Sequence, residues 1–119
     1  MNTNKIKCFA VDVDGTIADN NGQIDLEAAA TLRNLSKLGY QIVFVSGRTA
    51  CELMILAKYI GTSNISVGEN GGVIAKSPLD IQIIGNKSKT TEAFNLLCKE
   101  ISNVKIKTSI PRLSEVVLE

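Results

Sequence analysis

Short apolar runs alternate along the chain with stretches in which apolar residues recur every three or four positions. The runs are typical of buried β-strands, and the recurring spacing is typical of amphipathic helices. Over the first 68 residues the order is strand, helix, strand, helix, strand. We expect the strands at 5–13, 41–46 and 65–67, and the helices at 25–38 and 47–60. This alternation with short connections predicts a parallel sheet with covering helices.

Individual residues mark the ends of these elements. Asp25 is a good helix N-cap, and Gly39 suits the left-handed position that follows a helix. Asn70-Gly71 lies between two apolar runs and predicts a β-hairpin, because both residues tolerate positive φ. The first strand shows no polar alternation, so we expect it to be buried on both faces.

The pattern changes after Pro78. Here we expect a strand at 81–84, a helix at about 91–101 and two strands near 104–108 and 114–118. Lys105 and Lys107 alternate along one of these strands and predict a solvated face. The sequence therefore predicts a core at 1–78 and the first part of another domain at 79–119.

Composition narrows the chemistry. Of 119 residues, 45% are apolar and 21% charged, which is typical of a soluble globular domain. A formal charge of +1 argues against nucleic acid or an anionic membrane as partner. No apolar run could span a bilayer and no secretory signal is present, so we expect a cytoplasmic protein. The chain contains no histidine, so carboxylates, hydroxyls and lysines must carry any catalysis.

The cysteines point to no special site. Cys8, Cys51 and Cys98 are odd in number and lack the spacing of a zinc site or a disulfide framework. Each has apolar neighbours in the sequence, so we expect buried thiols that pack as small hydrophobic side chains.

Candidate chemistry gathers where the strands end. Ligands of open α/β sheets bind beyond the carboxyl ends of the strands. The first strand is followed by Asp12 and Asp14, and the second by Ser46-Gly47-Arg48, which opens a helix. A helix N-terminus favours phosphate, and Mg²⁺ binds through one or two carboxylates together with phosphate oxygens. The pattern therefore predicts a site for Mg²⁺ and a phosphate group.

Three further residues are candidates for the substrate side of this site. Arg48 either contacts the substrate or faces solvent at the start of the helix. Glu69 and Asn70 follow the third strand, where they suit a turn and could also lie beside the active site.

The segment Asp12-Val13-Asp14-Gly15-Thr16-Ile17 resembles the first motif of the haloacid dehalogenase superfamily of phosphotransferases. The resemblance implies an α/β, Rossmann-like, three-layer fold with a parallel half-sheet, a β-hairpin and the start of an α+β cap. It implies that Asp12 is the nucleophile and a Mg²⁺ ligand. It makes Asp14 the general acid and base, with a backbone carbonyl that binds Mg²⁺. The implied phosphate-binding residues are Gly15, Thr16, Ser46 and Gly47.

The order of motifs is similar to that of the archaeal phosphoglycolate phosphatase branch, but only the front half of that family's length is matched. The lysine of the third motif and the downstream acidic motif have no counterpart. The function implied is a Mg²⁺-dependent phosphomonoester hydrolase that acts on a small phosphorylated metabolite through an aspartyl-phosphate. The alternative is a catalytically incomplete, truncated module that binds phosphate, self-associates as a homo-oligomer or needs a complementing chain.

Overall fold

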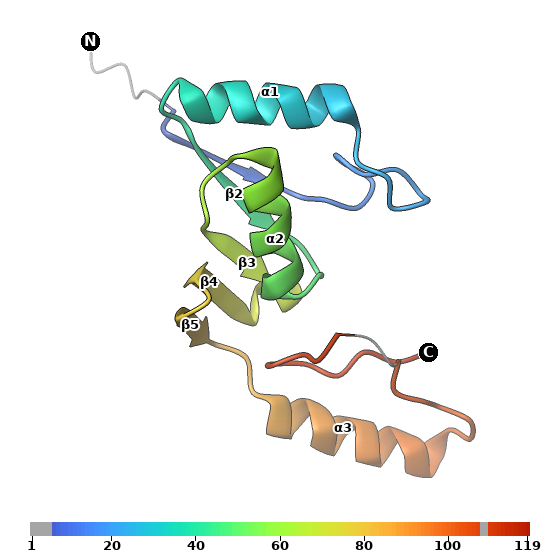
Figure 1. The fold of residues 1–119 in the computed structure, drawn as a ribbon. Helices are drawn as coiled ribbons and strands as arrows, with labels where there is room; N and C mark the ends of the chain where they lie inside the picture. The colour runs from blue at the N-terminus through green and yellow to red at the C-terminus, as the bar shows by residue number, and fades with distance from the viewer. Residues whose placement is uncertain (1–5, 108–109) are drawn as a thin grey trace.

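The computed structural model describes residues 6–107 and 110–119. Its core is a five-stranded sheet with the strand order β1-β2-β3-β4-β5 (Figure 1). The strands β1 (Cys8–Val11), β2 (Gln41–Val45) and β3 (Ser66–Gly68) are parallel, and β4 (Val73–Ser77) and β5 (Asp80–Ile83) continue the sheet antiparallel. The predicted parallel half-sheet with a hairpin is confirmed.

The two predicted helices of the first half are also confirmed. In α1 (Leu26–Lys37) the side chain of Asp25 accepts a hydrogen bond from the Ala28 N–H at 2.8 Å, as an N-cap does. In α2 (Ala50–Ile60) Thr49 is the N-cap, and Gly61 ends the helix with a φ of 85°. The second helix therefore begins three residues later than expected, because Gly47 and Arg48 belong to the turn that precedes it.

The main core lies between these helices and one face of the sheet. Ile42 and Phe44 of β2 are fully buried against Leu32 of α1 and Leu53 of α2. Because α1 and α2 contribute to one cluster, they cover the same face. The described elements thus form two of the three layers that the resemblance implies.

The first strand is not buried on both faces, so that prediction is wrong. Cys8 and Ala10 are exposed, and only Phe9 and Val11 pack against the core. The reason is that α1 and α2 cover the face of the sheet that carries Phe9 and Val11, whereas no described helix packs on the face that carries Cys8 and Ala10. The predicted burial of the cysteines is wrong as well, since Cys8, Cys51 and Cys98 are all exposed.

The turn between β3 and β4 is a short 3-10 segment, η1 (Glu69–Gly71). Asn70 and Gly71 have φ values of 55° and 92°, as the hairpin signal requires, and Glu69 also has a positive φ of 52°. A positive φ is unusual for glutamate, so contacts elsewhere must stabilise this turn.

Beyond the sheet, α3 (Lys87–Glu100) contains no buried residue, and in Figure 1 it lies apart from the core. It begins earlier than expected, with Asn86 as its N-cap, and it ends at the exposed C-cap residue Ile101. The two expected C-terminal strands reduce to one antiparallel bridge between Ile106 and Leu118, residue 108 lying outside the described residues. We call residues 104–107 and 110–119 the C-terminal segment. None of the described helices is long and apolar enough to cross a membrane.

Candidate active site

The loops after β1 and β2 meet at one edge of the sheet. The two strands are parallel neighbours, with Val11 beside Phe44, so both loops leave from their carboxyl ends. A two-nitrogen contact joins the loops: Arg48 Nε donates to Asp14 Oδ2 at 2.9 Å, and Nη2 donates to Oδ1 at 2.6 Å. The structure therefore brings the predicted acid and the predicted phosphate-binding turn together.

The electrostatics of Asp14 follow from this contact. The Arg48 hydrogen bond, helped by its charge, outweighs partial desolvation and holds the pKa of the Asp14 carboxyl below its ordinary value. Arg48 also lies 3.7 Å from a carboxylate oxygen of Glu52, so one guanidinium serves two acids. The side chains of Arg48 and Asp14 remain 36% and 51% exposed, so dissolved salt screens the attraction between them.

The loop that carries the two acids is tightly anchored. The carbonyl of Val13 accepts backbone hydrogen bonds from Thr16, Ile17 and Ala18 at 3.2, 3.0 and 2.9 Å. The side chains of Val13, Ile17 and Ala18 are buried in the core. Asp12 is exposed, and its Oδ1 accepts the N–H of Val13 at 2.8 Å. A buried loop base therefore supports solvent-facing carboxylates.

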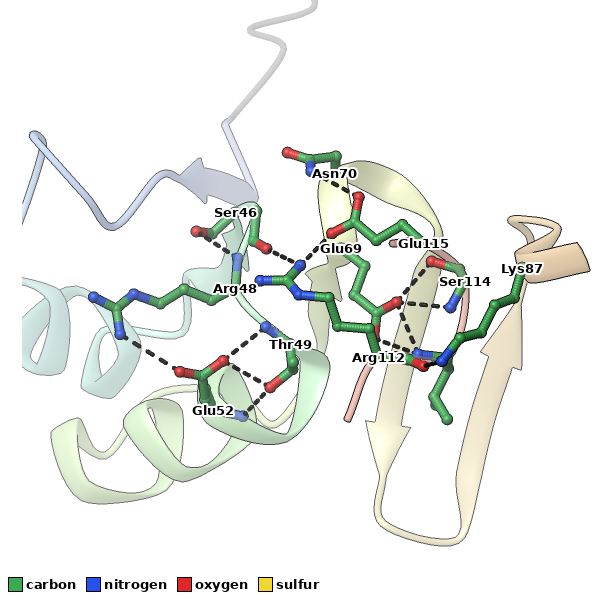
Figure 2. Close-up of polar contacts among 12 residues, drawn as sticks. Ser46, Arg48, Thr49, Glu52, Glu69, Asn70, Lys87, Arg112, Ser114 and Glu115 are labelled. Carbon is green, nitrogen blue, oxygen red and sulfur yellow. Dashed lines mark hydrogen bonds and ion pairs between the residues drawn. The ribbon is translucent and has the colours of Figure 1, made fainter. Parts of the chain in front are cut away.

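The Ser46–Gly47 turn is held by both of its neighbours in space. Ser46 N donates to the carbonyl of Val67, and Ser46 Oγ accepts from the Arg48 N–H at 3.3 Å (Figure 2). A Cβ at Gly47 would lie 2.9 Å from Asn70 Oδ1, so a larger residue at this position would displace the Asn70 side chain. The turn ends in a capping box in which Thr49 N donates to Glu52 at 2.9 Å and Glu52 N donates back to Thr49 Oγ1 at 3.3 Å.

Glu69 joins the core to the C-terminal segment. Its carboxylate is buried and accepts the N–H of Leu113 at 2.9 and 3.0 Å, and the N–H and Oγ of Ser114, each at 2.8 Å. Burial raises the pKa of Glu69, but these hydrogen bonds and the nearby Arg112 charge outweigh it and lower the pKa below the ordinary value. We call this arrangement the Glu69 clasp. It explains how η1 tolerates a positive φ at Glu69.

The clasp carries Arg112 to the active-site edge. Figure 2 shows its side chain reaching from the C-terminal segment to the Ser46–Gly47 turn, where Nη1 donates to the Gly47 carbonyl at 2.7 Å. Nη1 also contacts Glu115, and Lys87 donates to the Arg112 carbonyl. Glu115 accepts from Asn70 Nδ2 at 2.9 Å. The C-terminal segment therefore lies over the Ser46–Gly47 turn, held there by Arg112 and Glu115 of the segment and by Asn70 of the core.

A cavity of about 300 Å³ opens where the two parts meet. Its lining residues are Asp14, Gly47, Arg48, Glu52, Lys107, Ile110, Arg112 and Val117. Three of the predicted site residues, Asp14, Gly47 and Arg48, line this one space. Such a volume lies at the lower end of the range for small-molecule pockets, so it suits a small ligand.

The residues present offer a minimal set of oxygen ligands for Mg²⁺. Among the described residues no group of three or more Cys, Asp and Glu side chains could hold a metal. Asp12 presents an exposed carboxylate, and none of the hydrogen bonds among described residues ends on the Asp14 carbonyl. Mg²⁺ often uses one or two protein oxygens and completes its octahedron with water and phosphate, so the two groups fit a weak Mg²⁺ site.

Glu69 and Asn70 form the turn that the sequence predicted, but their side chains have partners that it did not predict. Both bind the C-terminal segment, so their polar groups are engaged with Ser114 and Glu115. Glu52 and Arg112, which sequence reasoning passed over, line the cavity. Lys107, for which the sequence predicted a solvated face, is exposed and lines the cavity as well. For Glu52 a signal existed, since Thr-x-x-Glu before an apolar run is a capping box. For Arg112 no local signal exists, because its position depends on the path of the C-terminal segment.

Comparison with known proteins gives a consistent result. A family model of haloacid dehalogenase-like hydrolases matches residues 9–118. The phosphoglycolate phosphatase of Nitrosopumilus maritimus is 42% identical over 116 residues, which are 97% of this chain and 50% of that protein. The phosphoglycolate phosphatase of Methanothermobacter thermautotrophicus is 34% identical over 113 residues, which are 95% of this chain and 51% of that protein. The chain thus spans about half the length of these curated relatives.

Solved structures agree on the fold. The crystal structure of Thermoplasma acidophilum protein 0175 superposes with a TM-score of 0.82 at 23% identity, covering 92% of this chain and 48% of that one. A haloacid dehalogenase-like hydrolase from B. subtilis superposes with a TM-score of 0.63 at 26% identity, covering 82% of this chain and 34% of that one. Since the family model spans nearly the whole sequence, the chain belongs to the haloacid dehalogenase-like hydrolases.

Proposed function

We propose that this chain carries the nucleophile-bearing part of a Mg²⁺-dependent phosphatase that acts on small phosphate monoesters such as phosphoglycolate. The observation that carries the proposal is the contact of Arg48 with Asp14, which joins the acidic loop to the Ser46–Gly47 turn beside a small cavity. The names of the relatives support the choice of ester.

In the proposed reaction a carboxylate oxygen of Asp12 attacks phosphorus while the bond from phosphorus to the ester oxygen breaks. Asp14 gives a proton to the departing alkoxide. Water then attacks the phosphorus of the aspartyl-phosphate, Asp14 takes up the proton, and inorganic phosphate leaves as the Asp12 carboxylate is restored. The hydroxyl of Ser46 and the N–H of Gly47 bind the phosphate oxygens. The N–H groups of Gly15 and Thr16, which the resemblance assigns to phosphate, donate instead to the carbonyls of Ala18 and Val13. Asp12 and the Asp14 carbonyl would hold Mg²⁺, which would supply positive charge against the phosphate.

Arg48 must change partners during this cycle. While its guanidinium contacts both oxygens of Asp14, that carboxylate stays ionised and cannot act as an acid. A phosphate dianion is a stronger competitor for a guanidinium than one exposed carboxylate. Phosphate binding to Arg48 therefore frees Asp14 for proton transfer.

The first test is phosphate release from an aryl phosphate. We expect release to require Mg²⁺ and to be abolished in Asp12→Asn, because an amide neither attacks phosphorus nor binds Mg²⁺ as an anion. Asp19→Asn is the matched control. Asp19 is an exposed acid of the same loop whose Oδ1 accepts the N–H groups of Asn21 and Gln23, a role that an asparagine oxygen keeps, so the rate should stay within about twofold.

Two results would contradict the proposal. One is activity that survives in Asp12→Asn, which would assign the release to another protein. The other is absence of activity and of Mg²⁺-dependent phosphate binding in the unaltered chain, which would favour the alternative of a module that needs a complementing chain.

A further inference from the structure

Two basic side chains of the C-terminal segment, Lys107 and Arg112, line the same cavity as Asp14 and Arg48. We propose that they form a subsite for a second anionic group of the substrate, a carboxylate on a small phosphate ester. The inference rests on the proposed function, because it takes the phosphate to lie at the Ser46–Gly47 turn.

Lys107 brings a positive charge that the protein itself does not neutralise. Its ammonium group forms no ion pair with any of the described residues, although Asp14 and Glu52 line the same cavity. Its backbone is nevertheless held, since Lys107 N donates to the carbonyl of Val117 at 2.8 Å and Ile106 bridges to Leu118. A fixed backbone thus presents an uncompensated cation at the cavity.

Arg112 brings a guanidinium that is only partly used. Nη1 is engaged by the Gly47 carbonyl and Glu115, while Nε is buried and has no hydrogen-bond partner among the described residues. A buried N–H without an acceptor is unfavourable, so an anion that reaches the guanidinium gains a hydrogen bond that the free protein lacks. A planar guanidinium also matches the two oxygens of a carboxylate.

The cations that line the cavity differ in whether a carboxylate of the protein already pairs with them. Arg48 already serves Asp14 and Glu52, and Arg112 is paired with Glu115. Lys107 is therefore the cation of the cavity that remains without a counter-charge among the described residues. With about 300 Å³ available, the ester must be small, so its two anionic groups lie only a few bonds apart.

The test compares two ligands that differ in one group. Phosphoglycolate and ethyl phosphate are both two-carbon phosphate monoesters, and only the first carries a carboxylate. The affinities are measured by calorimetric titration, and Mg²⁺ is left out to prevent turnover. The unaltered chain should bind phosphoglycolate about tenfold more tightly than ethyl phosphate, because one charge-assisted hydrogen bond contributes about that much. Lys107→Met should remove most of this preference and leave the affinity for ethyl phosphate unchanged.

Lys105→Met is the matched control, because Lys105 lies two residues away on the same segment but does not line the cavity. It should change neither affinity. Arg112→Lys should retain more of the preference than Arg112→Gln, which loses the charge. Equal affinities of the unaltered chain for the two esters, or equal losses for both esters in Lys107→Met, would overturn the subsite alone. Failure of the unaltered chain to bind either ester would overturn the phosphate site as well.

Discussion

Arg48 and Asp14 are residues whose roles depend on each other. The guanidinium contacts both carboxylate oxygens, at 2.9 and 2.6 Å, and links the loops that follow β1 and β2. The sequence did not decide whether Arg48 contacts the substrate or faces solvent, since a residue at a helix start can do either. The contact with Asp14 places it beside the chemistry and explains the lowered pKa of Asp14.

The exchange of partners at Arg48 gives a prediction at this scale. In Arg48→Ala the pKa of Asp14 should rise toward the ordinary aspartate value, because the hydrogen bonds and the charge that favour the ionised form are lost. Arg48→Lys, which keeps the charge but not the two-nitrogen contact, should give an intermediate pKa. Carboxyl ¹³C shifts followed against pH measure both variants. An Asp14 pKa that is identical in all three proteins would contradict the contact.

At the scale of elements, the Glu69 clasp joins the core sheet to the C-terminal segment. A turn of the core sheet accepts three donors from Leu113 and Ser114. Ser114 packs so closely that a Cβ added to Gly72 would lie 2.0 Å from its Oγ, and one added to Gly85 would lie 2.6 Å from its Cβ. Small residues on the core therefore allow the close approach that buries the Glu69 carboxylate.

The clasp should respond to acid. The pKa of Glu69 is lower in the folded chain than in the unfolded chain. The ionised carboxylate therefore stabilises the clasp fully above the ordinary glutamate pKa, about 4.3, and this stabilisation is lost as the pH falls toward the lower pKa of the folded chain. We expect the amide signals of Leu113 and Ser114 to show increased motion in NMR relaxation below about pH 4.

Two variants control this experiment. Glu69→Gln should loosen the same amides already at neutral pH, because an amide cannot replace a carboxylate that accepts several N–H groups. Glu92→Gln, at an exposed position of α3, should change nothing. Amides of Leu113 and Ser114 that stay rigid at neutral pH in Glu69→Gln would show that packing of Ser114 alone holds the segment.

At the scale of the whole molecule, the sheet ends in two edge strands, β1 and β5. In the strand order β1 is terminal, and the exposed Cys8 and Ala10 lie on it. An edge strand presents unpaired N–H and C=O groups, and this one carries neither proline nor a charged residue to prevent pairing. The molecule extends 57 Å along its longest axis, with α3 and β1 at opposite ends in Figure 1.

We therefore predict that the chain self-associates through β1 or binds a complementing strand there. Light scattering from micromolar to millimolar concentration should show association that Ala10→Lys suppresses, because a charge on the edge strand disfavours pairing. Ala10 is chosen because Phe9 packs against the core and Tyr40, so lysine at position 9 would disturb folding. Ala30→Lys, at an exposed position of α1, is the control. A monomer at every concentration would contradict self-association.

The sequence by itself determined the elements whose signals are local. Helix α1 follows from its apolar spacing and the Asp25 cap, and the hairpin follows from Asn70-Gly71, because periodicity and φ preferences act over a few residues. The acidic loop and the Ser46–Gly47 turn also followed, since strand order alone brings the carboxyl ends of β1 and β2 together.

Tertiary structure decided what depends on distant partners. Ser114 binds Glu69 45 residues away, and Arg112 reaches Gly47 65 residues away. Burial of the second face of β1 likewise depends on whether another element packs against it, which the residues of β1 do not specify. Local patterns carry no information on such contacts, because the energies that select them arise only when the C-terminal segment folds back over the sheet edge.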